Sequence, residues 1–179
     1  MFFRRNNGIP VAEYSPLLCE ALWTAIQVAN TYHAFGQIEV DEGESRDEGM
    51  QSFASDLARL DADADRLEIL RAKFDSKEPK YKSPKLVHHF ACRIVEYVYL
   101  RNVALTAAYA AKMRGEERKL MAATVNHNIY AHELSKYWGM FIYSLDSLEK
   151  KHSDLFQVLG FPDDLRAEIL RLTNGKSFP

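Results

Sequence analysis

Apolar side chains recur at every third or fourth position over most of the 179-residue chain. This spacing is typical of amphipathic helices that turn one side toward a core. It predicts long helices at about 16–35, 46–74, 84–114 and 116–148, and short ones at about 154–159 and 162–172. The sequence therefore predicts an all-α, single-domain, up-and-down bundle of four long helices with one or two short C-terminal capping helices.

Prolines and glycines mark the expected ends of these helices. Ser15-Pro16 and Ser83-Pro84 each place a capping hydroxyl before a proline, which predicts that the first and third helices begin there. Gly115 and Gly160 each follow a segment with helical periodicity. Glycine readily adopts the left-handed conformation that ends a helix, so we expect a helix to stop at each of them.

The segment before Ser15 lacks helical periodicity, and Gly8 and Pro10 interrupt it. We therefore expect residues 1–14 to form a flexible N-terminal arm. Residues 15–179 are expected to form one helical-bundle domain, because no internal repeat or second core is visible after the arm.

The last long helix carries the most regular apolar seam of the chain. Its members, at alternating steps of four and three residues, are Leu120, Thr124, His127, Ala131, Leu134, Trp138, Phe141, Leu145 and Leu148. Such a seam is typical of a helix that packs nearly antiparallel on another. The segment 125–128 consists of weak helix formers, so a break near Asn126 is the alternative to one continuous helix.

The region 94–111 is apolar on most sides, which predicts a central core helix. Glu96 and Arg101 interrupt it, and burying these charges in a bilayer would be costly, so we expect no membrane partner. Cys19 and Cys92 are too few for a disulfide framework, and the N-terminus lacks the apolar region of a secretory signal. These features predict a cytoplasmic protein.

Charge is unevenly distributed, although the net charge is only −2 and the pI about 6.3. Residues 39–72 carry 11 acidic and 4 basic side chains, whereas residues 73–119 carry 11 basic and 5 acidic ones. Opposite charges of this kind suit two contact surfaces for macromolecular partners. The acidic candidate surface comprises Asp41, Glu42, Glu44, Asp61 and Asp65. The basic candidate surface comprises Lys77, Lys80, Tyr81, Lys82 and Lys85.

Histidines supply the main candidate chemistry of the chain. His89 and Glu96 on the third helix, with His127 and His132 on the fourth, form the candidate pocket or metal-binding set. The H-E-x-x-H and paired C-x-x-C signatures of zinc sites are missing, and no glycine-rich phosphate loop occurs. We therefore expect no cofactor, keep a bound metal as the alternative, and assign no catalytic residue.

Several polar positions allow either a structural or a functional interpretation. We favour His127 as a neutral imidazole that donates to a backbone or tyrosine oxygen, over a base or ligand in a polar pocket. The polar stripe of the third helix either lines a cavity or faces water; it comprises His88, Cys92, Tyr99, Asn102, Thr106 and Tyr109. His88 and Cys92 lie four residues apart, but a helix interior offers no oxyanion hole, so nucleophilic catalysis is not expected.

Missing catalytic signatures, oppositely charged segments and many tyrosines favour a protein-binding role over an enzyme. The first hypothesis is a protein–protein adaptor, inhibitor or regulatory subunit. The second is a metal- or small-molecule-binding helical-bundle enzyme or sensor with a pocket between the third and fourth helices. The third is a small helical nucleic-acid-binding subunit that uses the basic surface. The sequence leaves the identity of the partner and the oligomeric state open.

Overall fold

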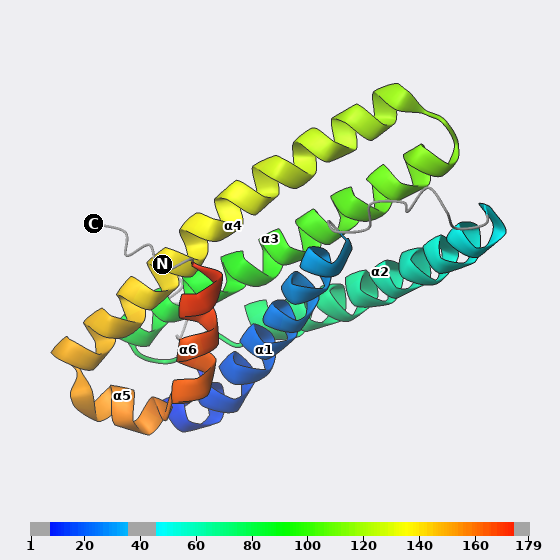
Figure 1. Cartoon of the computed structure of the whole chain (residues 1–179). Coiled ribbons are helices and arrows are strands. Elements are labelled where there is room, and N and C mark those ends of the chain that lie inside the picture. Colours follow the sequence, from blue (N-terminus) through cyan, green and yellow to red (C-terminus); the bar gives the residue numbers. More distant parts are fainter. Residues whose placement is uncertain (1–7, 36–45, 174–179) are drawn as a thin grey trace, which may run out of the picture.

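The computed structural model describes the backbone of residues 8–35 and 46–173, and the side chains of residues 8–30, 55 and 57–173. These residues form six α-helices and no strand. The helices are α1 (Val11–Phe35), α2 (Arg46–Asp75), α3 (Lys82–Met113), α4 (Glu117–Lys151), α5 (Ser153–Leu159) and α6 (Asp163–Leu172). The predicted all-α bundle of four long helices with short C-terminal helices is confirmed (Figure 1).

Helix α3 occupies the centre of this arrangement, as its apolar sequence predicts. It forms a long antiparallel hairpin with α4, and α1 and α2 pack on its other sides (Figure 1). Ile94, Val95 and Val98 of α3 are completely buried. Among the described residues, α4 makes backbone contacts with α3, α5 and α6 but none with α1 or α2. None of the described helices has the length and apolar character needed to cross a membrane.

Helix α1 begins at Val11, so the predicted start at Ser15-Pro16 is wrong. The carbonyl of Pro10 accepts the first helical hydrogen bond, from the backbone N–H of Tyr14 at 3.0 Å. Pro16 lies inside the helix on an exposed position and removes one helical hydrogen bond there, because proline has no backbone N–H. Ser15 caps nothing, because its hydroxyl donates to the carbonyl of Leu159 in α5.

The segment just before α1 is held against the linker between α2 and α3. The N–H of Ile9 donates to the carbonyl of Glu78 at 3.0 Å, and the N–H of Lys80 donates to the carbonyl of Ile9 at 2.9 Å. Ile9 thereby forms an isolated parallel bridge with Pro79. Residues 8–14, which the sequence assigns to a flexible arm, therefore pair with the linker and enter α1; residues 1–7 lie outside the described part.

Helix α3 begins at Lys82 with no side chain capping its first turn, so the predicted cap at Ser83-Pro84 is also wrong. Proline is tolerated in a first turn, because the N–H that it lacks would have no helical partner there. Helix α4 runs as one helix through residues 125–128, so the alternative of a break near Asn126 does not occur. Gly115 and Gly160 adopt φ values of 67° and 54° at helix ends, as predicted.

The predicted seam of α4 is buried only along its C-terminal half. The buried members are Leu134, Trp138, Phe141, Leu145 and Leu148. The earlier members, Leu120, Thr124, His127 and Ala131, remain partly or fully exposed. The difference arises because α5 and α6 cover the C-terminal half of α4, whereas its N-terminal half packs on α3 (Figure 1).

We predict that Gly8→Ala destabilises the protein. A Cβ at this position would lie 2.6 Å from Cα of Lys80 and 2.9 Å from the carbonyl carbon of Pro79, and backbone atoms cannot yield as a flexible side chain would. Overpacking of this kind lowers the free energy of unfolding by about 1–3 kcal/mol, measurable by urea denaturation. Ala12→Ser adds one atom at an exposed position of α1 and should change stability by less than about 0.5 kcal/mol. Equal stabilities of both variants would contradict the pairing of this segment with the linker.

Candidate functional site

Two pockets lie on either side of the N-terminal part of α3. The α2–α3 pocket has a volume of about 430 Å³ and is lined by Arg71, Asp75, Glu78, Lys85, His88, His89, Cys92, Arg93 and Glu96. The α3–α4 pocket has a volume of about 530 Å³ and lies between the start of α3 and the end of α4. Lys85 and His89 line both pockets. The two pockets therefore meet at these side chains.

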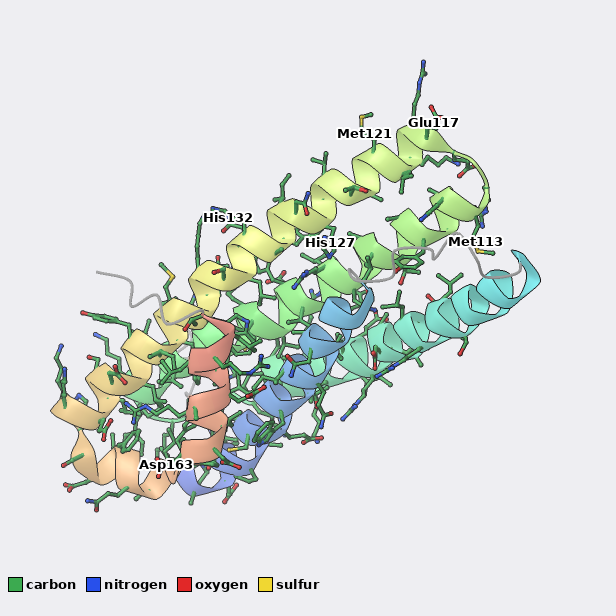
Figure 2. The ribbon with its side chains drawn as sticks, in the orientation of Figure 1. Met113, Glu117, Met121, His127, His132 and Asp163 are labelled. Atoms are coloured by element: carbon green, nitrogen blue, oxygen red, sulfur yellow. The ribbon has the colours of Figure 1, made fainter. Side chains whose placement is uncertain are left out.

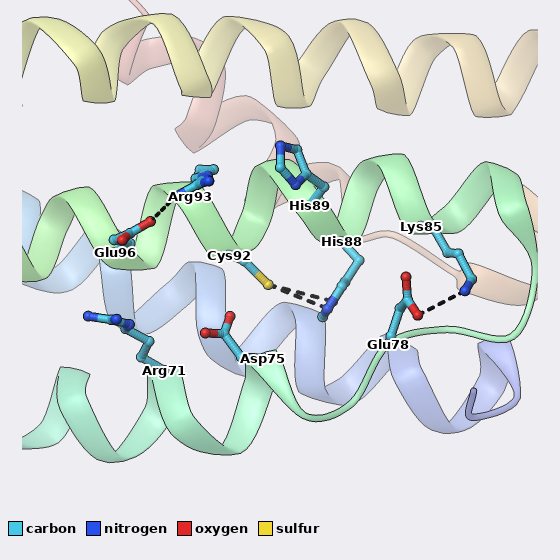
Figure 3. A pocket seen from close by; sticks show the side chains of 9 residues that line it. All are labelled: Arg71, Asp75, Glu78, Lys85, His88, His89, Cys92, Arg93 and Glu96. Carbon is cyan, nitrogen blue, oxygen red and sulfur yellow. Dashed lines mark hydrogen bonds and ion pairs between the residues drawn. The ribbon is translucent and has the colours of Figure 1, made fainter. Parts of the chain in front are cut away.

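The α2–α3 pocket is balanced in charge. Its lining contains three cationic side chains, Arg71, Lys85 and Arg93, and three carboxylates, Asp75, Glu78 and Glu96. Nζ of Lys85 lies 2.8 Å from a carboxylate oxygen of Glu78, and the guanidinium of Arg93 lies 2.6 Å from that of Glu96 (Figure 3). Because the charges of the lining neutralise one another, this pocket has no net attraction for a charged ligand.

His88 and Cys92 form the inner wall of the α2–α3 pocket, with 3.4 Å between Sγ and Nε2 (Figure 3). Burial raises the pKa of the Cys92 thiol, and the neighbouring Asp75 carboxylate raises it further. Burial lowers the pKa of His88, against the opposing effect of Glu78 and Asp75. The pair is thus a protonated thiol beside a neutral imidazole, which disfavours a thiolate nucleophile.

The four residues of the predicted pocket or metal set do not converge. His89 and Glu96 line the α2–α3 pocket, whereas His127 and His132 line neither pocket. His132 is exposed on the outer side of α4, and His127 points toward α3 (Figure 2). No group of three or more histidine, cysteine or carboxylate side chains in the described part of the chain could hold a metal ion. A pocket between the third and fourth helices does exist, but of the four predicted residues only His89 lines it.

His127 pairs with Arg101 across the interface between α3 and α4. Nε of Arg101 donates to Nε2 of His127 at 3.1 Å, which requires an unprotonated Nε2 and therefore a neutral imidazole. Burial lowers the pKa of His127, and the charge of Arg101 lowers it further. The neutral imidazole agrees with the prediction, and an arginine donor faces it across the helix interface.

The polar stripe of α3 faces other helices more than it faces a cavity. His88 packs against the rings of Tyr14 and Phe74, with centroids 5.5 and 4.8 Å away. Asn102 is completely buried and donates from Nδ2 to the carbonyl of Leu60 in α2 at 2.6 Å. From this stripe, His88 and Cys92 alone line the α2–α3 pocket.

The predicted charged surfaces are only partly described. In the basic set, Lys77, Lys80 and Tyr81 are exposed in the linker, whereas Lys82 and Lys85 line the α3–α4 pocket. In the acidic set, Asp61 and Asp65 are exposed on α2. Asp41, Glu42 and Glu44 lie outside the described residues. The structure therefore places two members of the basic set in a pocket together with the end of α4.

Helix α4 also carries an exposed apolar stripe that the sequence analysis missed. The apolar stripe consists of Met121, Val125 and Ile129, with exposed fractions of 71%, 51% and 52%. Steps of four residues place these side chains on one side of the helix, and Met121 points away from α3 (Figure 2). Residues 120–132 contain no Asp, Glu, Lys or Arg. This lack of charge is visible in the sequence, but none of the three residues belongs to the predicted seam 120–148.

We predict that protonation of His88 destabilises the fold at acidic pH. The folded state holds the pKa of His88 below its ordinary value of 6.5, so the unfolded chain takes up the proton first. The free energy of unfolding contributed by this residue is therefore present above pH 6.5 and falls as the pH drops below it. His88→Phe keeps a ring against Tyr14 and Phe74, and it should lose less stability than the wild type between about pH 7.5 and 5.5 in urea denaturation.

The control for this prediction is His132→Gln, a change at an exposed position of α4. It should lose as much stability as the wild type over the same pH range, since an exposed side chain is hydrated in both states. A His88→Phe variant with the wild-type pH dependence would show that other groups cause the acid sensitivity.

Comparisons with known proteins assign no family to this chain. No family model matches the sequence, and no curated protein or solved structure matches it either.

Proposed function

We propose that this protein binds another protein through the distal half of the α3–α4 hairpin. The observation that carries the proposal is the apolar stripe of Met121, Val125 and Ile129 within a helical segment that has no charged side chain. The cores of protein interfaces are depleted of charge and enriched in methionine and aromatic side chains. An exposed face of this composition is therefore suited to contact with another protein.

Helix α2 provides a comparison within the same molecule. Its exposed side carries Asp61, Asp65 and Glu68, as is usual for a helix that faces water. The distal hairpin differs on both helices, because residues 102–111 of α3 also lack charged side chains and Val103 is 42% exposed. The fold itself buries Asn102, Ala104, Ala108 and Ala111 of the α3 segment, so the exposed stripe of α4 is the stronger support for a covered role.

The charged residues of this region are concentrated at the hairpin tip, residues 112–119, which carries four basic and two acidic side chains. Lys119 forms an ion pair with Glu116 at 2.9 Å. Arg114 and Arg118 are exposed and form no ion pair with the described residues. A partner that fits both features presents an apolar segment to the stripe and acidic side chains to the tip.

The size of the apolar stripe suits a modest affinity. Covering a half-exposed aliphatic side chain contributes about 1 kcal/mol, so three of them need the contacts of the tip to give a specific complex. A cytosolic setting is part of this proposal, and the free thiols of Cys19 and Cys92 support it.

The test is a double substitution, Val125→Lys with Ile129→Lys, which places two charges on the apolar stripe. Binding of the partner should fall about tenfold or more, because an interface core would have to bury both ammonium groups. The measurement is quantitative affinity capture from the native host, comparing the wild type and the variants, followed by titration of the captured protein. Thermal unfolding should differ little from that of the wild type, since both positions are exposed.

The matched control is Ile69→Lys, which places the same charge on an isoleucine of α2 that is 71% exposed. It should retain the partner that the double variant loses. Equal capture by the wild type and the double variant would overturn the proposal. A wild-type dimer and a monomeric double variant in light scattering would also overturn it, because the face would then be covered by a second copy of the chain.

A further inference from the structure

A second binding site follows from the α3–α4 pocket, at the opposite end of the hairpin from the apolar stripe. The lining of this pocket contains Lys82, Lys85 and Lys151, together with His89 and His152, and no carboxylate. We propose that the α3–α4 pocket binds the phosphoryl group of a small phosphorylated molecule. This proposal does not depend on the protein-binding role of the distal hairpin.

The lining of the α3–α4 pocket carries a net positive charge. Lys85 is ion-paired with Glu78 at 2.8 Å, so its charge is largely compensated. Lys82 and Lys151 are exposed and form no ion pair with any described residue. They come from the beginning of α3 and the end of α4, so folding brings two uncompensated ammonium groups to one cavity. The neighbouring α2–α3 pocket, with equal numbers of cations and carboxylates, has no such excess.

The two helix ends at the pocket carry opposite partial charges, so the charges of the lysines decide which ligand the pocket favours. The first turn of α3 has no acidic residue and no side-chain cap, which leaves its positive end available to an anion. The last turn of α4 presents carbonyl groups, and one of them, that of Leu148, is already bonded to the N–H of His152 at 2.8 Å. The two backbone contributions roughly cancel, and the two ammonium groups remain as the net attraction for an anion.

The remaining lining indicates what kind of anion fits. The hydroxyl groups of Ser83 and Ser147 are further hydrogen-bond donors in the pocket, and phosphoryl oxygens accept several such bonds at once. Leu86 and Leu148 add an apolar part to the lining. The volume of about 530 Å³ exceeds the needs of a phosphate ion alone and accommodates an organic group attached to it. A phosphate monoester with a small apolar group matches both the polar and the apolar part of the lining.

The test uses phenyl phosphate and pyrophosphate as probes, titrated into the full chain by calorimetry at low salt. The wild type should bind phenyl phosphate, and Lys82→Gln combined with Lys151→Gln should weaken binding about tenfold or more, through loss of two charge-assisted hydrogen bonds. Lys150→Gln is the matched control, because it removes the same charge from the same turn at a residue that does not line the pocket. It should change affinity by less than about twofold, since its charge is screened by solvent.

The backbone amide resonance of Ser83 should shift on addition of phenyl phosphate to the wild type and shift much less at the same concentration in the double variant. This readout locates the ligand and confirms that the variant is folded. Absence of binding to the wild type, or an equal loss in Lys150→Gln, overturns the proposal. Binding of a short single-stranded oligonucleotide without binding of phenyl phosphate also overturns it and supports a nucleic-acid backbone as the source of the phosphoryl group.

Discussion

The other helices are arranged around the apolar sides of α3. Ile94, Val95 and Val98 of this helix have no solvent exposure, and α1, α2 and α4 all pack on α3. Complete burial of such side chains contributes about 1.5–3 kcal/mol each. An exposed ion pair such as Lys73 with Glu20 contributes about 1 kcal/mol at most. The positions of the other helices therefore follow from covering α3.

The hairpin of α3 and α4 presents different chemistry at its two ends because their neighbours differ. At one end, the linker, α5 and α6 surround the hairpin, and charged pockets form beside Lys85 and His89. At the other end, α3 is the one described helix that α4 contacts, and the apolar stripe stays exposed. A helix rises 1.5 Å per residue, so Val125 and Lys151 lie about 40 Å apart. The two proposed sites are thus separate in space and in chemistry.

Three conspicuous polar residues of the bundle are held by neighbouring side chains and carbonyl groups. Asn102 donates to the carbonyl of Leu60, and His127 accepts from Arg101. His88 is enclosed by the rings of Tyr14 and Phe74. Desolvation costs of buried polar groups are reduced by such partners. These contacts join residues of different helices and so contribute to the alignment of the helices.

The helices and much of the core follow from local sequence, since the spacing of apolar residues such as Leu60, Leu67 and Trp138 sets which side of a helix is buried. How each side and each helix end is covered depends on the packing of distant segments. Ser15 bonds a carbonyl of α5 instead of capping a helix, and Lys82 meets Lys151 in one pocket. These contacts join residues that are far apart in the sequence. They depend on how the helices pack, so no local sequence pattern predicts them.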